Sequence, residues 1–100
     1  MESNEKYHLR LKIEFEDEPD RFEYQDFETL VHSSLKTVLG EVGACKPYDL
    51  IDFNAKTRKG CLRCESEDLH LIWAALTVYG SYYGTPVAIH VEKVNILGKN

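Results

Sequence analysis

Cysteine and histidine are the residues of this chain whose types and spacing come nearest to a reactive or metal-binding site. Cys61 and Cys64 have the Cys-x-x-Cys spacing of zinc ligands and redox dithiols. They fall in a run typical of a β-strand, in which residues three apart point to opposite faces. Cys45 is the one other cysteine in the sequence, so a second ligand pair is missing. We therefore expect no metal and no cofactor.

The histidines and carboxylates show no recognisable catalytic spacing. His8 and His90 fall in two predicted strands, and histidines on a sheet surface are usually solvated. The sequence has no His-Glu-x-x-His, no Gly-x-Ser-x-Gly and no phosphate-binding glycine loop. We expect no catalytic residues, so the chain by itself is predicted not to be an enzyme.

Charge is distributed unevenly along a chain whose net charge is −5. The segment Glu14–Glu28 is strongly acidic, whereas Lys46–Arg63 has a local excess of cations. Overall acidity argues against coating of nucleic acid by bulk attraction, but a local cluster could still contact phosphates. An ordinary pair of solvated charged surfaces remains the alternative. The predicted RNA-binding residues are Lys56, Arg58, Lys59 and Arg63, with Arg10 and Lys12 as additional candidates.

A helix predicted within Ser66–Gly80 is apolar on two opposite sides. Leu69, Ile72, Trp73 and Leu76 share one side and would face the core. A small domain can cover one apolar stripe with its own sheet, but hardly two, so the second side indicates a protein partner. Alternatively, its alanines are simply helix formers and its larger residues ordinary exposed ones. The predicted partner-binding residues are Leu71, Ala74, Ala75 and Val78.

These candidate residues fit a single domain covering residues 1–100, with frayed ends at 1–6 and 96–100. The predicted order is β-α-β-β-α-β, an α+β, ferredoxin-like or RNA-recognition-like sandwich. Both helices would cover one face of a four-stranded antiparallel sheet. Arg10, Lys12, Glu14, Cys61 and Arg63 would then lie on its open face. Before the second helix, the strands are Tyr7–Glu16, Tyr48–Phe53 and Cys61–Cys64, and the first helix is Tyr24–Leu39; a strand at Val87–Val94 comes last.

The longest nearly apolar run, Leu69–Tyr79, is too short to span a bilayer. The N-terminal residues lack the basic and apolar regions of a signal peptide, and an odd number of cysteines fits a reducing compartment. We expect a soluble intracellular protein with no membrane partner.

Three segments in a fixed order resemble the small protein subunits shared by ribonuclease P and MRP ribonuclease. They are Phe53-Asn-Ala-Lys-Thr57, Leu62-Arg-Cys64 and Leu71-Ile-Trp-Ala-Ala-Leu76. Leu39-Gly-Glu-Val-Gly43 and Leu76-Thr-Val-Tyr-Gly-Ser-Tyr-Tyr-Gly84 look more like the fourteen-kilodalton member of that family than its longer paralogue.

The resemblance implies a non-catalytic scaffold subunit in the nucleus and nucleolus. In that family the RNA performs the hydrolysis that removes the 5′ leader of precursor tRNA. The implied partners are the thirty-kilodalton barrel-shaped subunit, the longer paralogous subunit and the ribonuclease P RNA.

Two other functions remain open from the sequence. A stand-alone RNA-binding domain would share the fold and the basic hairpin. A small enzyme of the acylphosphatase type would also share the fold, but its phosphate loop follows the first strand and needs an arginine. Here that loop is Asp17-Glu-Pro-Asp20, which is acidic and unsuited to an anionic substrate.

Overall fold

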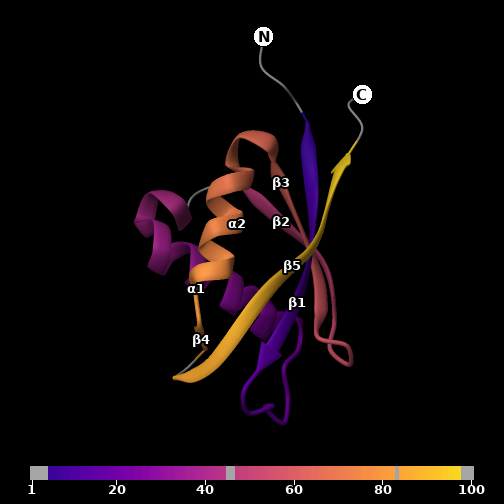
Figure 1. Ribbon diagram of the computed structural model, residues 1–100, viewed down its shortest axis with the longest axis vertical. Helices are drawn as coiled ribbons and strands as arrows, with labels where there is room; N and C mark the ends of the chain where they lie inside the picture. Colours follow the sequence, from indigo (N-terminus) through magenta and orange to yellow (C-terminus); the bar gives the residue numbers. More distant parts are fainter. Residues whose placement is uncertain (1–4, 45–46, 83, 98–100) are drawn as a thin grey trace.

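The computed structural model describes residues 5–44, 47–82 and 84–97 of the chain. Three strands and one long helix come first, and a short 3-10 turn then leads into a second helix and two more strands (Figure 1). The elements are β1 (Lys6–Phe15), α1 (Tyr24–Ala44), β2 (Tyr48–Asn54), β3 (Lys59–Glu65), η1 (Ser66–Asp68), α2 (Leu69–Val78), β4 (Ser81–Tyr82) and β5 (Thr85–Leu97).

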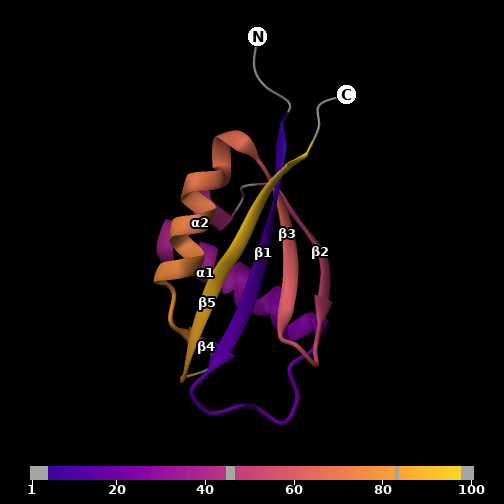
Figure 2. The same cartoon turned by 45° about the vertical axis from the view of Figure 1, so that its right-hand side comes forward.

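The strands form one antiparallel sheet in the order β2-β3-β1-β5-β4. Figure 2 shows that α1 and α2 lie together on one side of this sheet and leave its other side open. The predicted α+β, ferredoxin-like fold is therefore confirmed. The two-residue strand β4 is an addition, formed where the Tyr- and Gly-containing segment before Thr85 folds back on the start of β5.

Strict alternation in β1 determines which side chains enter the core and which face the open side. Leu9, Leu11 and Ile13 are buried beneath the helices. Residues between them, such as Arg10 and Lys12, consequently point to the open face. On the helix side, the core continues in Leu62 of β3, Ile89 of β5, Phe27, Leu30, Val31 and Leu35 of α1, and Ile72 and Leu76 of α2.

Helix α1 is interrupted at Gly40, where φ is 81° and ψ is −170°. This conformation is accessible essentially to glycine alone, because a Cβ atom would clash with the backbone. The expectation that Gly40 or Gly43 ends the helix is therefore met in part: the regular helix stops at Gly40, and helical backbone then continues to Ala44.

Two features of the chain ends and helix starts differ from expectation. Ser66 does not cap the second helix; it lies in η1, and α2 begins at Leu69 after Asp68, which makes no side-chain capping hydrogen bond. Lys6, Ile96 and Leu97, which the sequence assigns to frayed ends, are paired in β1 and β5. Residues 1–4 and 98–100 of those ends lie outside the described part. No described helix is long and apolar enough to cross a membrane.

Candidate functional site

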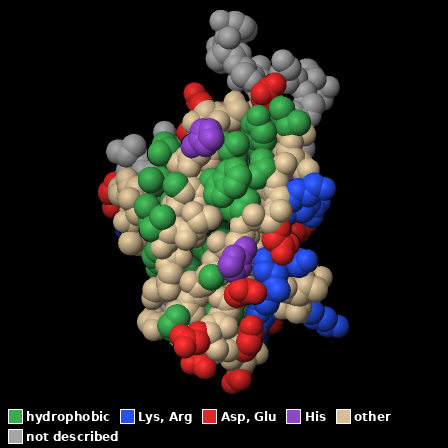
Figure 3. Space-filling view, in the orientation of Figure 1, with side chains coloured by type: hydrophobic (Ala, Val, Ile, Leu, Met, Phe, Trp, Pro, Cys, Tyr) green, Lys and Arg blue, Asp and Glu red, His purple; other side chains and the backbone are tan. Residues whose placement is uncertain are grey.

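Helix α2 carries an exposed apolar stripe on its outer side. Leu71, Ala74 and Val78 are spaced i, i+3 and i+7, so they lie along one line of the helix surface. Leu71 is 45% exposed, Val78 is 71% exposed, and Ala74 is exposed too. We call these three residues the α2 stripe. Figure 3 shows hydrophobic side chains gathered over α2 and the neighbouring part of β5.

Ala75, one of the four predicted partner-binding residues, does not lie on the exposed surface of α2. Its side chain is fully buried, together with Ile72 and Leu76, against the sheet and α1. Trp73, expected on the core side, is instead 38% exposed on the opposite flank of the helix from the α2 stripe. Both differences have one cause: the sheet-facing direction of α2 lies between Ala75 and Leu76, and a helical wheel alone does not reveal that direction.

Among the predicted RNA-binding residues, Arg58 departs most from the expected exposed position on the hairpin. Its side chain is 17% exposed and packs over the rings of Phe15 and Phe22 at 5.8 and 5.7 Å. Nε and Nη2 donate to Glu18 Oε1 at 3.2 and 3.0 Å. Nη1 donates to the carbonyl oxygens of Phe22 and Ala55 at 3.3 and 2.8 Å, and Nη2 donates to that of Pro19 at 3.4 Å.

A guanidinium has five N–H donors, and these contacts account for all of them. The side chain therefore fastens the acidic loop after β1 to the β2–β3 hairpin and has no donor left for a phosphate. The prediction that Arg58 contacts RNA therefore finds no free donor in this arrangement. An enzyme of the acylphosphatase type would need a free arginine at the loop after β1. Arg58 lies near that loop, but its guanidinium is already bonded to Glu18.

The other three hairpin cations differ in how free they are. Arg63 Nη2 is paired with Asp49 Oδ2 at 2.8 Å, and Lys59 Nζ lies 3.5 Å from Glu92 Oε1. Lys56 is exposed in the turn, where its backbone N–H donates to Asn54 Oδ1 at 2.9 Å. Of the four predicted residues, Lys56 alone forms no ion pair within the described part of the chain.

The Cys-x-x-Cys pair is divided between the two faces of β3. Cys64 lies in the core on the helix side, where burial, ahead of the nearby Asp68 and Glu65 charges, raises the pKa of its thiol to about 11. Cys61 lies opposite Arg10 on the open face, and burial also raises the pKa of its thiol. Two thiols on opposite faces of one strand cannot bind the same ion. Cys45, the third cysteine, lies outside the described residues.

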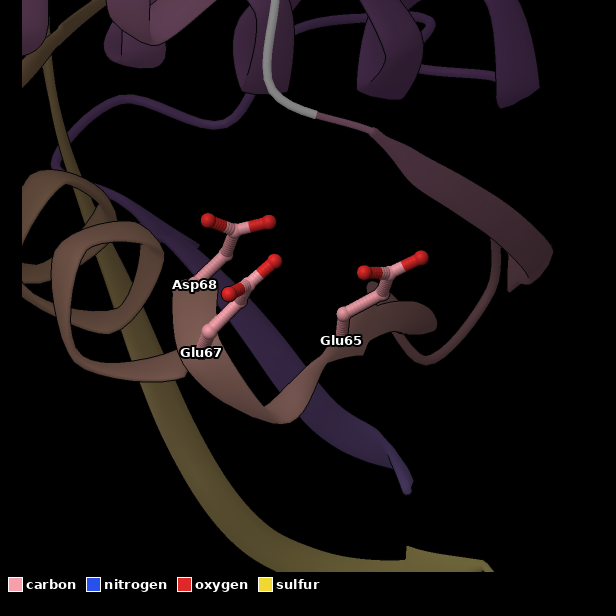
Figure 4. A group of neighbouring side chains, drawn as sticks. All are labelled: Glu65, Glu67 and Asp68. Atoms are coloured by element: carbon pink, nitrogen blue, oxygen red, sulfur yellow. The ribbon is translucent and has the colours of Figure 1, made fainter. Parts of the chain in front are cut away.

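Three carboxylates gather just before α2 (Figure 4). One oxygen each of Glu65, Glu67 and Asp68 lies within 4.8 Å of the others. Glu65 is also paired with Lys6 Nζ at 3.4 Å. Their position near the start of α2 is favourable, because the N-terminal end of a helix attracts negative charge.

A bulge in β5 brings to the open face a cation that the sequence interpretation missed. Arg10 pairs with Lys93 and Leu11 pairs with Val91, so Glu92 is the extra residue. The alternation that holds up to Val91 is therefore shifted by one, and Lys93 faces the same side as Arg10. Continuing the alternation from Val87 would have placed Lys93 in the core. Its charge was the one available signal against that placement.

Comparison with known proteins agrees with this architecture and names its family. The Rpp14/Pop5 family model matches residues 8–95, which is most of the chain. The chain belongs to the Rpp14/Pop5 family.

Relatives of this Rpp14/Pop5 protein include two named ribonuclease P protein subunit p14. The mouse protein is 30% identical over 92 residues, covering 92% of this chain and 75% of the relative. The human protein is 33% identical over 92 residues, covering 92% and 74%. A chain in the cryo-electron microscopy structure of yeast ribonuclease MRP superimposes with a TM-score of 0.82. The match covers 95% of our chain and 76% of the yeast chain at 15% sequence identity, so it shows a shared fold.

Proposed function

We propose that this Rpp14/Pop5 protein is a non-catalytic protein subunit of ribonuclease P, the ribonucleoprotein that removes the 5′ leader of precursor tRNA. The same role in the related MRP ribonuclease is included in the proposal. The RNA component performs the hydrolysis, and this chain scaffolds the particle through protein contacts. The exposed α2 stripe is the observation that carries the proposal, and membership of a family with relatives named ribonuclease P subunits supports it.

The α2 stripe supports a protein partner because its exposure is costly for an isolated domain. Val78 is the most exposed of the large hydrophobic side chains that we find in the described residues, and Leu71 is about two turns away on the same side. Burying such side chains removes apolar area from water at about 25 cal/mol per Å². A partner helix or sheet seated on α2 would gain this energy, whereas the sheet of this chain already covers the opposite side of α2.

The partners that we propose are the thirty-kilodalton barrel-shaped subunit, the longer paralogous subunit and the ribonuclease P RNA. Their assembly would place the chain in the nucleus, including the nucleolus. Among the predicted RNA contacts, Lys56, Lys59 and Arg63 remain candidates, while Arg58 is committed to the acidic loop.

Replacing Val78 with aspartate tests the proposed docking of the α2 stripe. We expect Val78→Asp in a tagged chain to lose the ribonuclease P protein subunits that co-purify with the wild type. Circular dichroism should show an unchanged fold, because the Val78 side chain lies largely in solvent.

Thr77→Asp is the matched control. It adds the same charge to the same exposed turn, but about 100° away around the helix, and should retain the partners. Retention of the partners by Val78→Asp would contradict the docking surface. Absence of ribonuclease P subunits from the wild-type purification would contradict the function itself.

A further inference from the structure

The open face of the sheet carries cations that are not neutralised by neighbouring carboxylates. Arg10 and Lys12 project from β1, and Lys93 projects from β5 directly opposite Arg10. We call these three residues the open-face cations. No described carboxylate forms an ion pair with any of them. Figure 3 shows Lys and Arg side chains along the sheet side of the molecule, away from α2.

Two carboxylates of this face, Glu14 and Glu92, already have partners of their own. Glu14 is bonded to His90 Nε2 at 2.8 Å, and Glu92 is paired with Lys59 Nζ at 3.5 Å. Lys59 in turn lies opposite Lys12 in the sheet. The positive charge of the open-face cations is thus left facing solvent, in a chain whose net charge is −5.

We propose that the open-face cations, Arg10, Lys12 and Lys93, bind the phosphate backbone of a single-stranded RNA segment laid across β1 and β5. This proposal rests on the proposed function, which supplies an RNA component, and moves the main phosphate contact from the hairpin to the sheet. Phosphate contacts of this kind position the RNA without selecting its sequence.

The composition of the face favours phosphates over a protein partner. On the open side of β3, β1 and β5, the described side chains are charged, polar or small, and the aromatic rings among them are the imidazoles of His8 and His90. Protein interfaces usually depend on buried aromatic or large apolar anchors, which are missing there. Extensive base stacking usually uses Phe, Tyr or Trp, none of which is described on this side of the three strands, and His90 is already held by Glu14. Contact with the phosphate backbone is therefore what this surface mainly provides.

A cavity at the end of the sheet extends the surface toward the hairpin. Its volume is about 440 Å³, and Lys12 and Lys56 both line it. Glu14, Glu18 and Arg58 line it too, with Arg58 already bonded to Glu18. Lys56, the unpaired hairpin cation, can therefore contact the same RNA segment as Lys12.

Salt dependence of RNA binding tests the open-face cations directly. Fluorescein-labelled polyuridylate is titrated with the purified full chain at a series of salt concentrations. Each phosphate contact on a single strand contributes about 0.7 to the slope of log K against log salt. We expect the triple change Arg10→Gln, Lys12→Gln and Lys93→Gln to reduce the slope by about 2. Lys36→Gln on α1, in the other layer, should leave it unchanged.

Three outcomes would contradict the proposal that the open-face cations bind RNA. One is an unchanged slope in the triple variant, and another is an equal loss in Lys36→Gln per charge removed. The third is displacement of the probe by polyglutamate as readily as by unlabelled polyuridylate, which would indicate an acidic protein ligand.

The proposed function is tested separately, by asking whether ribonuclease P subunits co-purify with the triple variant and with the wild type. If the triple variant retains these subunits and its salt-dependence slope is unchanged, the RNA-binding surface is refuted but the proposed function is not. Subunits absent from both purifications would refute the function.

Discussion

Truncating Arg58 to alanine separates a structural role from an RNA-binding role. The side chain joins the acidic loop after β1 to the β2–β3 hairpin through Glu18 and the carbonyls of Pro19 and Phe22, and it also donates to Ala55 within the hairpin. The backbone of Arg58 has a φ of 59°, but alanine meets the same restriction there. The change therefore measures the loss of side-chain contacts and not a change of backbone strain.

The expected cost follows from these contacts. A hydrogen bond contributes about 0.5–1.5 kcal/mol net, and the pair with the largely exposed Glu18 contributes at most about 1 kcal/mol. Packing over Phe15 and Phe22 adds about 0.5–1 kcal/mol. Because such contributions overlap, we expect a loss of about 2–4 kcal/mol in the free energy of unfolding. For a domain of this length, the melting temperature should fall by roughly 10–25 °C.

Thermal and urea unfolding followed by circular dichroism provide the assay. Arg58→Lys is the control, because it keeps the charge but cannot present five N–H donors in a plane. It should recover less than half of the lost stability, while RNA binding per folded molecule stays at the wild-type level in both variants. Arg58→Ala with wild-type stability and weakened RNA binding would refute the structural assignment.

Two further predictions concern the core. Gly60→Ala should destabilise the fold by about 1–3 kcal/mol in urea titrations, because a Cβ atom there would lie 2.7 Å from Phe27 Cζ. Phe27 is stacked on Phe53 at 4.7 Å and cannot easily yield, so an unaffected Gly60→Ala would contradict this packing. The raised pKa of Cys64 makes the folded state retain its proton, so its contribution to stability is complete below the unfolded pKa near 9 and is lost as pH rises to about 11. The pH dependence of unfolding should therefore be shallower in Cys64→Ala over this interval, and identical curves for the two proteins would disprove it.

Much of the fold could be predicted because alternation and helical spacing are local properties. The repeat from Leu9 to Phe15 determines β1 whatever its neighbours, and the apolar spacing from Phe27 to Leu35 does the same for α1. β4 was missed because two residues carry no periodic signal. β5 was predicted too short because the bulge at Glu92 breaks the alternation that begins at Val87, whereas pairing with β1 continues the strand to Leu97.

The candidate site was less predictable because it depends on relations between distant residues. Leu71 and Val78 were correctly expected to be exposed, but the burial of Ala75 depends on how α2 is rotated on the sheet. Arg58 belongs to a basic segment, and its partner Glu18 is 40 residues away in the sequence. Lys93 faces the open side because of one extra residue in β5, which no spacing in the sequence reveals.

The shortness of β4 has a consequence for handling the isolated chain. Among the described strands, β4 pairs with Thr85 and Pro86 alone, so most of the outer edge of β5 lacks a neighbouring strand. An open edge with an exposed isoleucine, Ile96, invites pairing between copies at high concentration. The bulge at Glu92 and the charge of Lys93 interrupt that edge and keep such pairing short. Association of the isolated chain through this edge should therefore be weak and should increase with protein concentration.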